Sequence, residues 1–167
     1  MNVLMNKLAL TLSGTALALA LVAGGASLNH AHADETTDGV DISKELYVTK
    51  TPTCGCCAGW VDIAGERGFK VAVTDTDDYE KMKRDANVPS KMQACHTTRV
   101  GRYVVEGHVP FEAIEKLMSE RPNIDGIAVP GMPMGSPGMG NDPEAVYAVF
   151  AYGGDAGERK LFYTAGQ

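Results

Sequence analysis

The sequence lacks the short motifs that mark the commonest nucleotide-binding and zinc-hydrolase sites. It contains no Walker loop, no G-x-G-x-x-G fingerprint and no H-E-x-x-H histidine pair, each of which sets phosphate-binding backbone or zinc ligands at a fixed spacing. No internal repeat is visible either. The chemistry of this protein therefore has to be sought in its individual residues.

Basic residues are also scarce. The chain has 15 Lys and Arg against 21 Asp and Glu, and its formal net charge is −6. An acidic protein is repelled by phosphate backbones and by anionic lipid surfaces. The composition argues against nucleic acid or an anionic membrane face as a partner, and it is compatible with attracting cations.

Long apolar runs are confined to the beginning of the chain. Lys7 precedes an almost uninterrupted apolar run over residues 8–26, and Ala31-His32-Ala33 fits the small-x-small cleavage pattern of exported proteins. We expect a signal peptide over residues 1–33, cleaved after Ala33, and export to the periplasm. A membrane anchor is the alternative, because about 18 apolar residues can span a bilayer, but the cleavage pattern and the acidic residues after it favour export. No cysteine lies near the cleavage point, so a lipid anchor is not supported.

Removal of residues 1–33 leaves 134 residues, enough for one hydrophobic core and too few for two ordinary domains. Lys7 is the only charged residue removed, so the formal net charge changes from −6 to −7. Residues 34–44 begin with a polar, acidic stretch without periodicity and are expected to form a flexible leader. Residues 45–167 are expected to form a single domain.

The pattern of the remaining residues predicts alternating strands and helices. Residues 45–50 alternate between polar and apolar side chains as a strand does, and Pro52 ends them. A helix is expected from Cys57, with its apolar stripe at positions 57, 60, 61 and 64 and a stop at Gly68. Further strands are predicted over 69–74, 94–100, 103–106, from 126 onward, 145–152 and 160–164, and further helices from Asp77 or Asp78 and from Pro110.

This order of elements predicts an α/β protein with a thioredoxin-like fold (β-α-β-α-β-β-α), followed by a C-terminal extension. The extension consists of a loop rich in Met and a β-hairpin. The ferredoxin-like fold of small metallochaperones is the main alternative, since it also places a Cys-x-x-Cys before its first helix. A helix between the second and third strands favours the thioredoxin-like fold.

Three of the four cysteines, Cys54, Cys56 and Cys57, lie within four residues. Exported proteins ordinarily use four cysteines as two disulfides, but these three are badly spaced for that, because pairing neighbouring or next-neighbouring cysteines closes almost no loop and strains the backbone. Cys54 and Cys57 lie at the start of the predicted helix, where unpaired N–H groups favour a thiolate. A stabilised thiolate favours disulfide exchange and metal binding equally. The additional thiol of Cys56 favours binding of a soft metal.

The segment that enters the third strand of a thioredoxin-like fold lies against the Cys-x-x-Cys turn, which would bring Cys95 and His96 to the three thiols. A lone disulfide from Cys95 to one of them is the alternative. His96 adjoins a cysteine and is a candidate ligand. His108, just before the third helix, is either a ligand or a capping side chain.

Three methionines, Met132, Met134 and Met139, lie in a loop dense in Gly and Pro. Thioether and thiolate together suit Cu(I), although Met also fills gaps in irregular loops. Structural zinc usually takes two separated cysteine pairs, whereas here three ligands crowd one turn. The ligand set therefore predicts copper, in the Cu(I) state and with more than one ion bridged by shared sulfurs, rather than zinc.

The residues resemble those of the CopG-like periplasmic copper-resistance proteins, a family long filed as a domain of unknown function. Three blocks carry the resemblance: ELYVTKTPTCGCCAGW, ACHTTRVGRYVVEGHVPFEAIEKL and GIAVPGMPMGSPGM. The resemblance implies a thioredoxin-like fold, export to the periplasm, copper binding and association with copper-resistance or copper-efflux systems. The metal-binding residues that it implies are Cys54, Cys56, Cys57, Cys95, His96 and His108.

Two functions of different classes remain open at the level of the sequence. One is a copper-binding protein of copper resistance that sequesters Cu(I), or that interconverts Cu(I) and Cu(II) by thiol redox chemistry. Its expected partners are copper ions and an efflux or redox protein, and no membrane anchor is expected after processing. The other is a periplasmic thiol–disulfide oxidoreductase, in which Cys54 attacks and Cys57 resolves. A disulfide-stapled interaction domain without activity is a third option.

Overall fold

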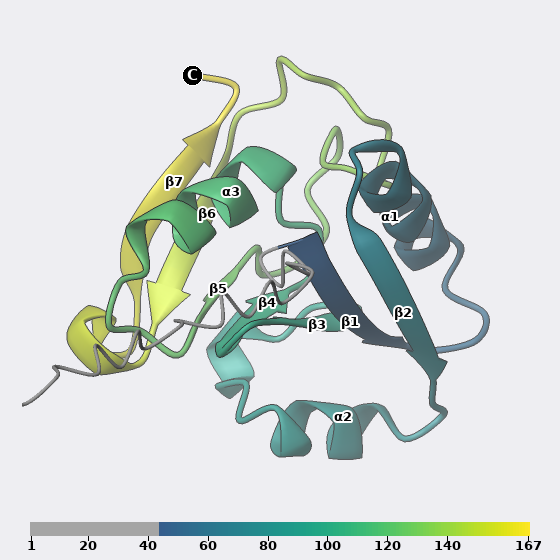
Figure 1. Ribbon diagram of the computed structural model, residues 1–167, viewed down its shortest axis with the longest axis horizontal. Helices are drawn as coiled ribbons and strands as arrows, with labels where there is room; N and C mark the ends of the chain where they lie inside the picture. Colours follow the sequence, from purple (N-terminus) through teal and green to yellow (C-terminus); the bar gives the residue numbers. More distant parts are fainter. Residues whose placement is uncertain (1–43) are drawn as a thin grey trace, which may run out of the picture. The chain divides into compact units, whose positions relative to one another are not determined.

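The computed structural model describes residues 44–167, so the signal peptide expected over 1–33 and nearly all of the leader expected over 34–44 lie outside the described residues. Within residues 44–167, three helices and seven strands follow one another in the order drawn in Figure 1. The strands are β1 (Glu45–Lys50), β2 (Lys70–Asp75), β3 (Thr97–Val100), β4 (Tyr103–Glu106), β5 (Gly126–Ala128), β6 (Tyr147–Tyr152) and β7 (Lys160–Ala165). The helices are α1 (Gly55–Glu66), α2 (Tyr79–Asp85) and α3 (Phe111–Glu120), with short 3-10 turns at Ser90–Met92 and Gly154–Ala156.

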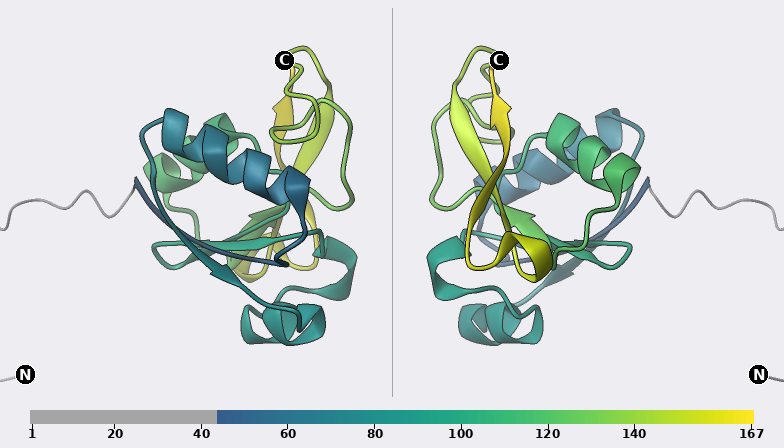
Figure 2. Two further views of the ribbon diagram at one scale, coloured as in Figure 1. Left: turned by 90° about the vertical axis from the view of Figure 1, so that its right-hand side faces the viewer. Right: turned by 90° about the vertical axis from the view of Figure 1, so that its left-hand side faces the viewer.

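All seven strands form one mixed sheet in the order β2-β1-β3-β4-β5-β6-β7. The pairs β1–β2 and β4–β5 are parallel, and the other four pairs are antiparallel. Helices α1 and α3 cover one face of the sheet, and α2 lies on the opposite face (Figure 2). None of the helices within the described residues is long and apolar enough to cross a membrane.

The main core lies between the sheet and helices α1 and α3. Leu46 and Val48 of β1 point into it while Tyr47 between them is exposed, as expected for a strand with one covered face. Trp60 of α1 and Phe111 of α3 are fully buried, with ring centroids 5.0 Å apart. These aromatic rings join the two helices above the same sheet face.

The structure confirms the predicted mixed α/β class and the order of its elements. β1 covers the residues predicted for it, Asp78 caps α2 through a bond from Lys81 N–H, and β6 and β7 form the expected terminal hairpin. The helix predicted from Cys57 begins two residues earlier, at Gly55, because the side chain of Cys54 serves as its N-cap and accepts from Cys57 N–H.

Three predicted strands begin one to three residues too early, and the largest difference lies before β3. Residues 94–100 were expected to be extended throughout, but β3 begins at Thr97. Ala94 donates its N–H to the carboxylate of Glu106 instead of to a neighbouring strand, and Cys95 lies in a bend. The side-chain bond therefore replaces the sheet ladder in this segment.

Candidate metal centre

Sheet topology brings the cysteine and histidine segments together. Because β3 runs antiparallel to β1, and β4 antiparallel to β3, the end of β1, the start of β3 and the end of β4 meet at one edge. The register is direct, with Thr97 paired to Thr49 on one side and to Glu106 on the other. The turn with the three thiols follows β1, Cys95-His96 precedes β3, and His108 follows β4.

The donor atoms form two overlapping groups. In the first group, the sulfurs of Cys54, Cys56, Cys57 and Cys95 all lie within 4.8 Å of one another. The second group, with the same separation, consists of Cys57, Cys95, His96 and His108. Cys57 and Cys95 belong to both groups, so six donors form one continuous cluster.

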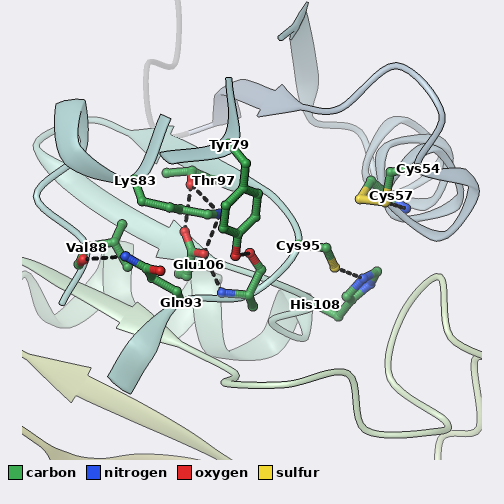
Figure 3. A network of polar contacts seen from close by, with 11 residues as sticks. Cys54, Cys57, Tyr79, Lys83, Val88, Gln93, Cys95, Thr97, Glu106 and His108 are labelled. Atoms are coloured by element: carbon green, nitrogen blue, oxygen red, sulfur yellow. Dashed lines mark hydrogen bonds and ion pairs between the residues drawn. A yellow bond between two sulfur atoms is a disulfide. The ribbon is translucent and has the colours of Figure 1, made fainter. Parts of the chain in front are cut away.

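Two of the four thiols are joined in this structure. Cys54 and Cys57 form a disulfide at the start of α1 (Figure 3). Cys56 and Cys95 are free. The sulfur of Cys56 lies 3.5 Å from that of Cys54. A metal is bound by thiolates rather than by disulfide sulfurs, so binding by all four cysteines requires this disulfide to be reduced.

His108 is oriented by a backbone carbonyl. Its Nδ1 lies 2.7 Å from the oxygen of Pro137, and its Nε2 lies 2.8 Å from Cys95 Sγ. A carbonyl oxygen can only accept, so Nδ1 carries the proton and the neutral ring presents the lone pair of Nε2 to Cys95. Metal-binding histidines are commonly held this way, with the second ring nitrogen donating to a carbonyl.

The electrostatics of the cluster favour neutral groups when no metal is bound. Burial, and then the neighbouring Cys56, raise the pKa of the Cys95 thiol to about 12. Burial also lowers the pKa of His108, against the effect of its bond to Pro137. Cys95 is therefore a protonated thiol at neutral pH, and it becomes a thiolate only when a cation replaces its proton.

His96 has two ring nitrogens without a hydrogen-bond partner although its side chain is 0% exposed. Burial, followed by the charges of His108 and Lys83, lowers its pKa to about 3. The rings of Trp60 and His108 pack against it, each with its centroid 5.0 Å away. Leaving a buried polar atom unpaired costs about 1–3 kcal/mol, and a metal ion between the cysteines and the histidines would satisfy one of these nitrogens. The residues present thus fit a soft metal.

The methionine loop approaches the cluster through its backbone. Gly138 packs so closely that a Cβ there would lie 2.4 Å from the carbonyl oxygen of Cys56. Met139 is half-buried, whereas Met132 and Met134 are 54% and 74% exposed. The structure therefore unites the predicted cysteines and histidines but leaves two of the three methionines mainly in solvent, and a ligand role for the methionines stays a prediction.

Sequence reasoning did not identify Pro137 and Gly138 as contributors to the site. Pro137 acts through its carbonyl and Gly138 through its lack of a side chain, so neither offers a ligand atom that a residue pattern detects. The signal that could have pointed to them is the density of Gly and Pro in the loop, since such residues let one backbone approach another closely.

Comparison with known proteins found a matching family model and similar solved structures. A family model described as "Protein of unknown function, DUF411" matches residues 92–139, which include Cys95, His96 and His108. Two solved structures of a copper resistance protein CopG, designated form 1 and form 2, are 37% identical to this chain. Each aligns over 72% of this chain and 96% or 95% of its own, with a TM-score of 0.65. No curated protein matched.

The fold and the cluster define an α/β protein in which thiols and imidazoles are grouped as a metal ion requires. This chain belongs to the CopG-like copper-resistance family. The similarity confirms the predicted family, and the cluster fits copper binding.

The close approach of Gly138 gives a first prediction. Gly138→Ala would force its Cβ to 2.9 Å from Trp60 N and 3.3 Å from His108 Nδ1, and the resulting shift would disturb the carbonyl that orients His108. We expect copper affinity to fall by about tenfold or more, as for other residues that support metal ligands. Competition with a copper chelator measures this.

Gly131→Ala is the matched control. Gly131 has φ +78° and Gly138 φ +79°, so both substitutions impose the same backbone strain, but a Cβ at Gly131 meets nothing within 4 Å. Its copper affinity should equal that of the wild type. Equal losses in both variants would show that strain in the loop, rather than contact with the cluster, controls binding.

The burial of His96 predicts a pH dependence of stability in the metal-free, reduced protein. The ordinary pKa of 6.5 applies to the unfolded chain and about 3 to the folded one, so between these values the unfolded state binds the extra proton. Stability should therefore decrease as pH falls from 6.5, by on the order of 2 kcal/mol at pH 5. Urea unfolding of the wild type and of His96→Leu at pH 7 and pH 5 checks this. The decrease in the free energy of unfolding between pH 7 and pH 5 should be smaller in His96→Leu by about 2 kcal/mol. Equal decreases in both proteins would contradict a lowered pKa of His96.

Proposed function

We propose that this protein is an exported copper-binding protein of copper homeostasis and resistance, which holds Cu(I) through Cys54, Cys56, Cys57, Cys95, His96 and His108. One observation carries the proposal: six soft or borderline donor atoms form one continuous cluster, in which Cys57, His96 and His108 are buried and the other three cysteines are half-buried. Thiolate and imidazole are the ligands that Cu(I) prefers, whereas hard cations require oxygen donors. The copper-resistance function of the similar solved structures supports the same cation.

The overlap of the two donor groups supports binding of more than one ion. Cys57 and Cys95 belong to both groups, and a thiolate sulfur can be shared between neighbouring Cu(I) ions. The four-cysteine group and the cysteine–histidine group would then each hold copper. The copper content of the reduced, loaded protein would exceed one ion per chain.

The scaffold that we propose for this centre is thioredoxin-like. The order β1-α1-β2-α2-β3-β4-α3 and the position of the Cys54–Cys57 pair at the N-terminus of α1 support it. Strands β5 to β7 and the methionine loop would then be an extension of that fold. Export to the periplasm fits the expected signal peptide, and a copper-efflux or redox partner would exchange copper with the protein there.

The Cys54–Cys57 disulfide adds a redox role to this proposal. Two thiolates can give one electron each to two Cu(II) ions, which forms the disulfide and two Cu(I) ions. The disulfide in this structure corresponds to the oxidised product of that exchange. An external dithiol, itself oxidised to a disulfide, would restore both thiols and close the cycle.

A periplasmic thiol–disulfide oxidoreductase is the second candidate, because Cys54 at the N-cap and Cys57 in the first turn have the arrangement that such enzymes use. Cys54 would attack a substrate disulfide and Cys57 would resolve the mixed disulfide. This function needs neither Cys56 nor His96. The dependence on Cys56 therefore separates the two candidates.

Cys56→Ser tests the proposed function. We expect its Cu(I) affinity, measured anaerobically against a Cu(I) chelator, to fall by more than about tenfold, since even supporting residues produce such a loss. Gly55→Ala is the matched control, because a Cβ there meets nothing within 4 Å and all thiols remain. Sub-stoichiometric copper in the wild type and in Cys56→Ser alike would reject the proposal. Reduction of insulin disulfides by both proteins at equal rates would then favour the oxidoreductase.

A further inference from the structure

A buried ion pair lies beside the metal centre, on the α2 side of the sheet. Lys83 of α2 and Glu106 of β4 are both 0% exposed, and Lys83 Nζ lies 2.7 Å from Glu106 Oε1 (Figure 3). Lys83 also donates to Thr97 Oγ1 at 3.1 Å and lies over the ring of Tyr79. Thr97 in turn donates to Glu106 Oε2 at 2.7 Å.

Stability alone does not account for this buried ion pair. Removing two charges from water is costly, and replacing a buried pair with apolar residues of similar volume is often neutral or stabilising. The face of the sheet around it is otherwise packed by apolar side chains such as Val88, Met92 and Val104. A buried ion pair in such an apolar surrounding is therefore expected to have a role other than stability.

The hydrogen-bond network formed by Tyr79, Lys83, Thr97 and Glu106 holds Ala94, the residue immediately before Cys95. Ala94 donates its N–H to Glu106 Oε1 at 2.7 Å, and its carbonyl accepts the hydroxyl of Tyr79 at 2.8 Å. Both backbone polar groups of Ala94 are thus bound by the side chains of Glu106 and Tyr79. Cys95 itself lies in a bend outside any helix or strand, so no element of regular structure fixes it on that side.

The same carboxylate joins the two ligand-bearing segments. Glu106 is two residues before His108, and the intervening Gly107 donates its N–H to the carbonyl of His96 at 2.9 Å. Gly107 also packs so tightly on Ala94 that a Cβ there would lie 2.5 Å from that of Ala94. The position of Cys95 relative to His108 therefore depends on Glu106, and Lys83 holds Glu106 in place.

We propose that Lys83 and Glu106 are positioning residues of the metal centre, which fix Ala94 and thereby hold Cys95 Sγ against His108 Nε2 and the sulfur of Cys57. Their role toward copper rests on the function proposed above. Their role toward Cys95 is a property of the metal-free protein, and it can be measured without copper.

The test uses the double variant Lys83→Met/Glu106→Leu, which removes both charges together and leaves no unpaired buried ion. In the reduced, metal-free protein we expect Cys95 to be alkylated by iodoacetamide about tenfold faster than in the wild type, because the hydrogen bond from Ala94 N–H to Glu106, which restrains the residue before Cys95, is lost. Peptide mass spectrometry follows Cys95 separately from the other cysteines. Lys83→Met/Glu106→Gln keeps an amide oxygen for Ala94 N–H and should restore part of the protection.

Copper binding gives the second readout. The Lys83→Met/Glu106→Leu variant should bind Cu(I) about 10–100-fold more weakly, and adding Cys95→Ser to it should cause no further loss, because the two changes then remove the same contribution. Met82→Ala, in the neighbouring buried position of α2, controls for destabilisation and should retain wild-type affinity. Should the double variant fail to fold, Tyr79→Phe removes only the bond to Ala94 and should shift both readouts in the same direction.

The outcomes separate this inference from the proposed function. Wild-type protein that binds no copper would reject the function, while the alkylation rates would still decide whether the pair positions Cys95. The inference would be overturned if the folded double variant bound copper as tightly as the wild type and its Cys95 were alkylated at the wild-type rate. A loss of affinity equal to that of Met82→Ala would overturn it as well.

Discussion

The antiparallel pairing of β3 with both β1 and β4 is the constraint on which the rest of this structure depends. It aligns Thr49, Thr97 and Glu106 in one row across the sheet, so three segments distant in the sequence leave or enter the sheet at the same edge. The thiols after β1, the Cys95-His96 pair and His108 are neighbours for this reason. No single segment could supply the two overlapping donor groups.

Half of the cluster is buried at a cost in solvation, and most of its donor atoms have a compensating contact. Cys57 donates its N–H to Cys54 Sγ, and His108 is held between Pro137 and Cys95. His96 is the exception, because both of its ring nitrogens are buried without a partner. An uncompensated imidazole beside the sulfurs of Cys57 and Cys95 indicates a site arranged for a ligand more than for stability.

The sequence predicted the order of the elements and the residues that form the cluster to the extent that these depend on local patterns. The alternation in residues 45–50 and the Cys-x-x-Cys spacing were sufficient to place Cys54 at the start of α1. The oxidation of Cys54 with Cys57 could not be predicted, because spacing permits thiol and disulfide equally. The carbonyl of Pro137 and the bond from Ala94 to Glu106 were missed since they depend on long-range contacts. The sequence signal for the bond between Ala94 and Glu106 was the charged residue at the end of the otherwise apolar strand Tyr103–Glu106.

X-ray absorption at the copper edge of the reduced, copper-loaded protein tests the central claim most directly, because it reports the metal's oxidation state and its ligand atoms together. The account predicts Cu(I) with sulfur and imidazole scattering, and loss of the imidazole contribution when His96 and His108 are both replaced by Leu. Copper bound only through oxygen or nitrogen atoms, or a spectrum unchanged by the loss of both histidines, would contradict it.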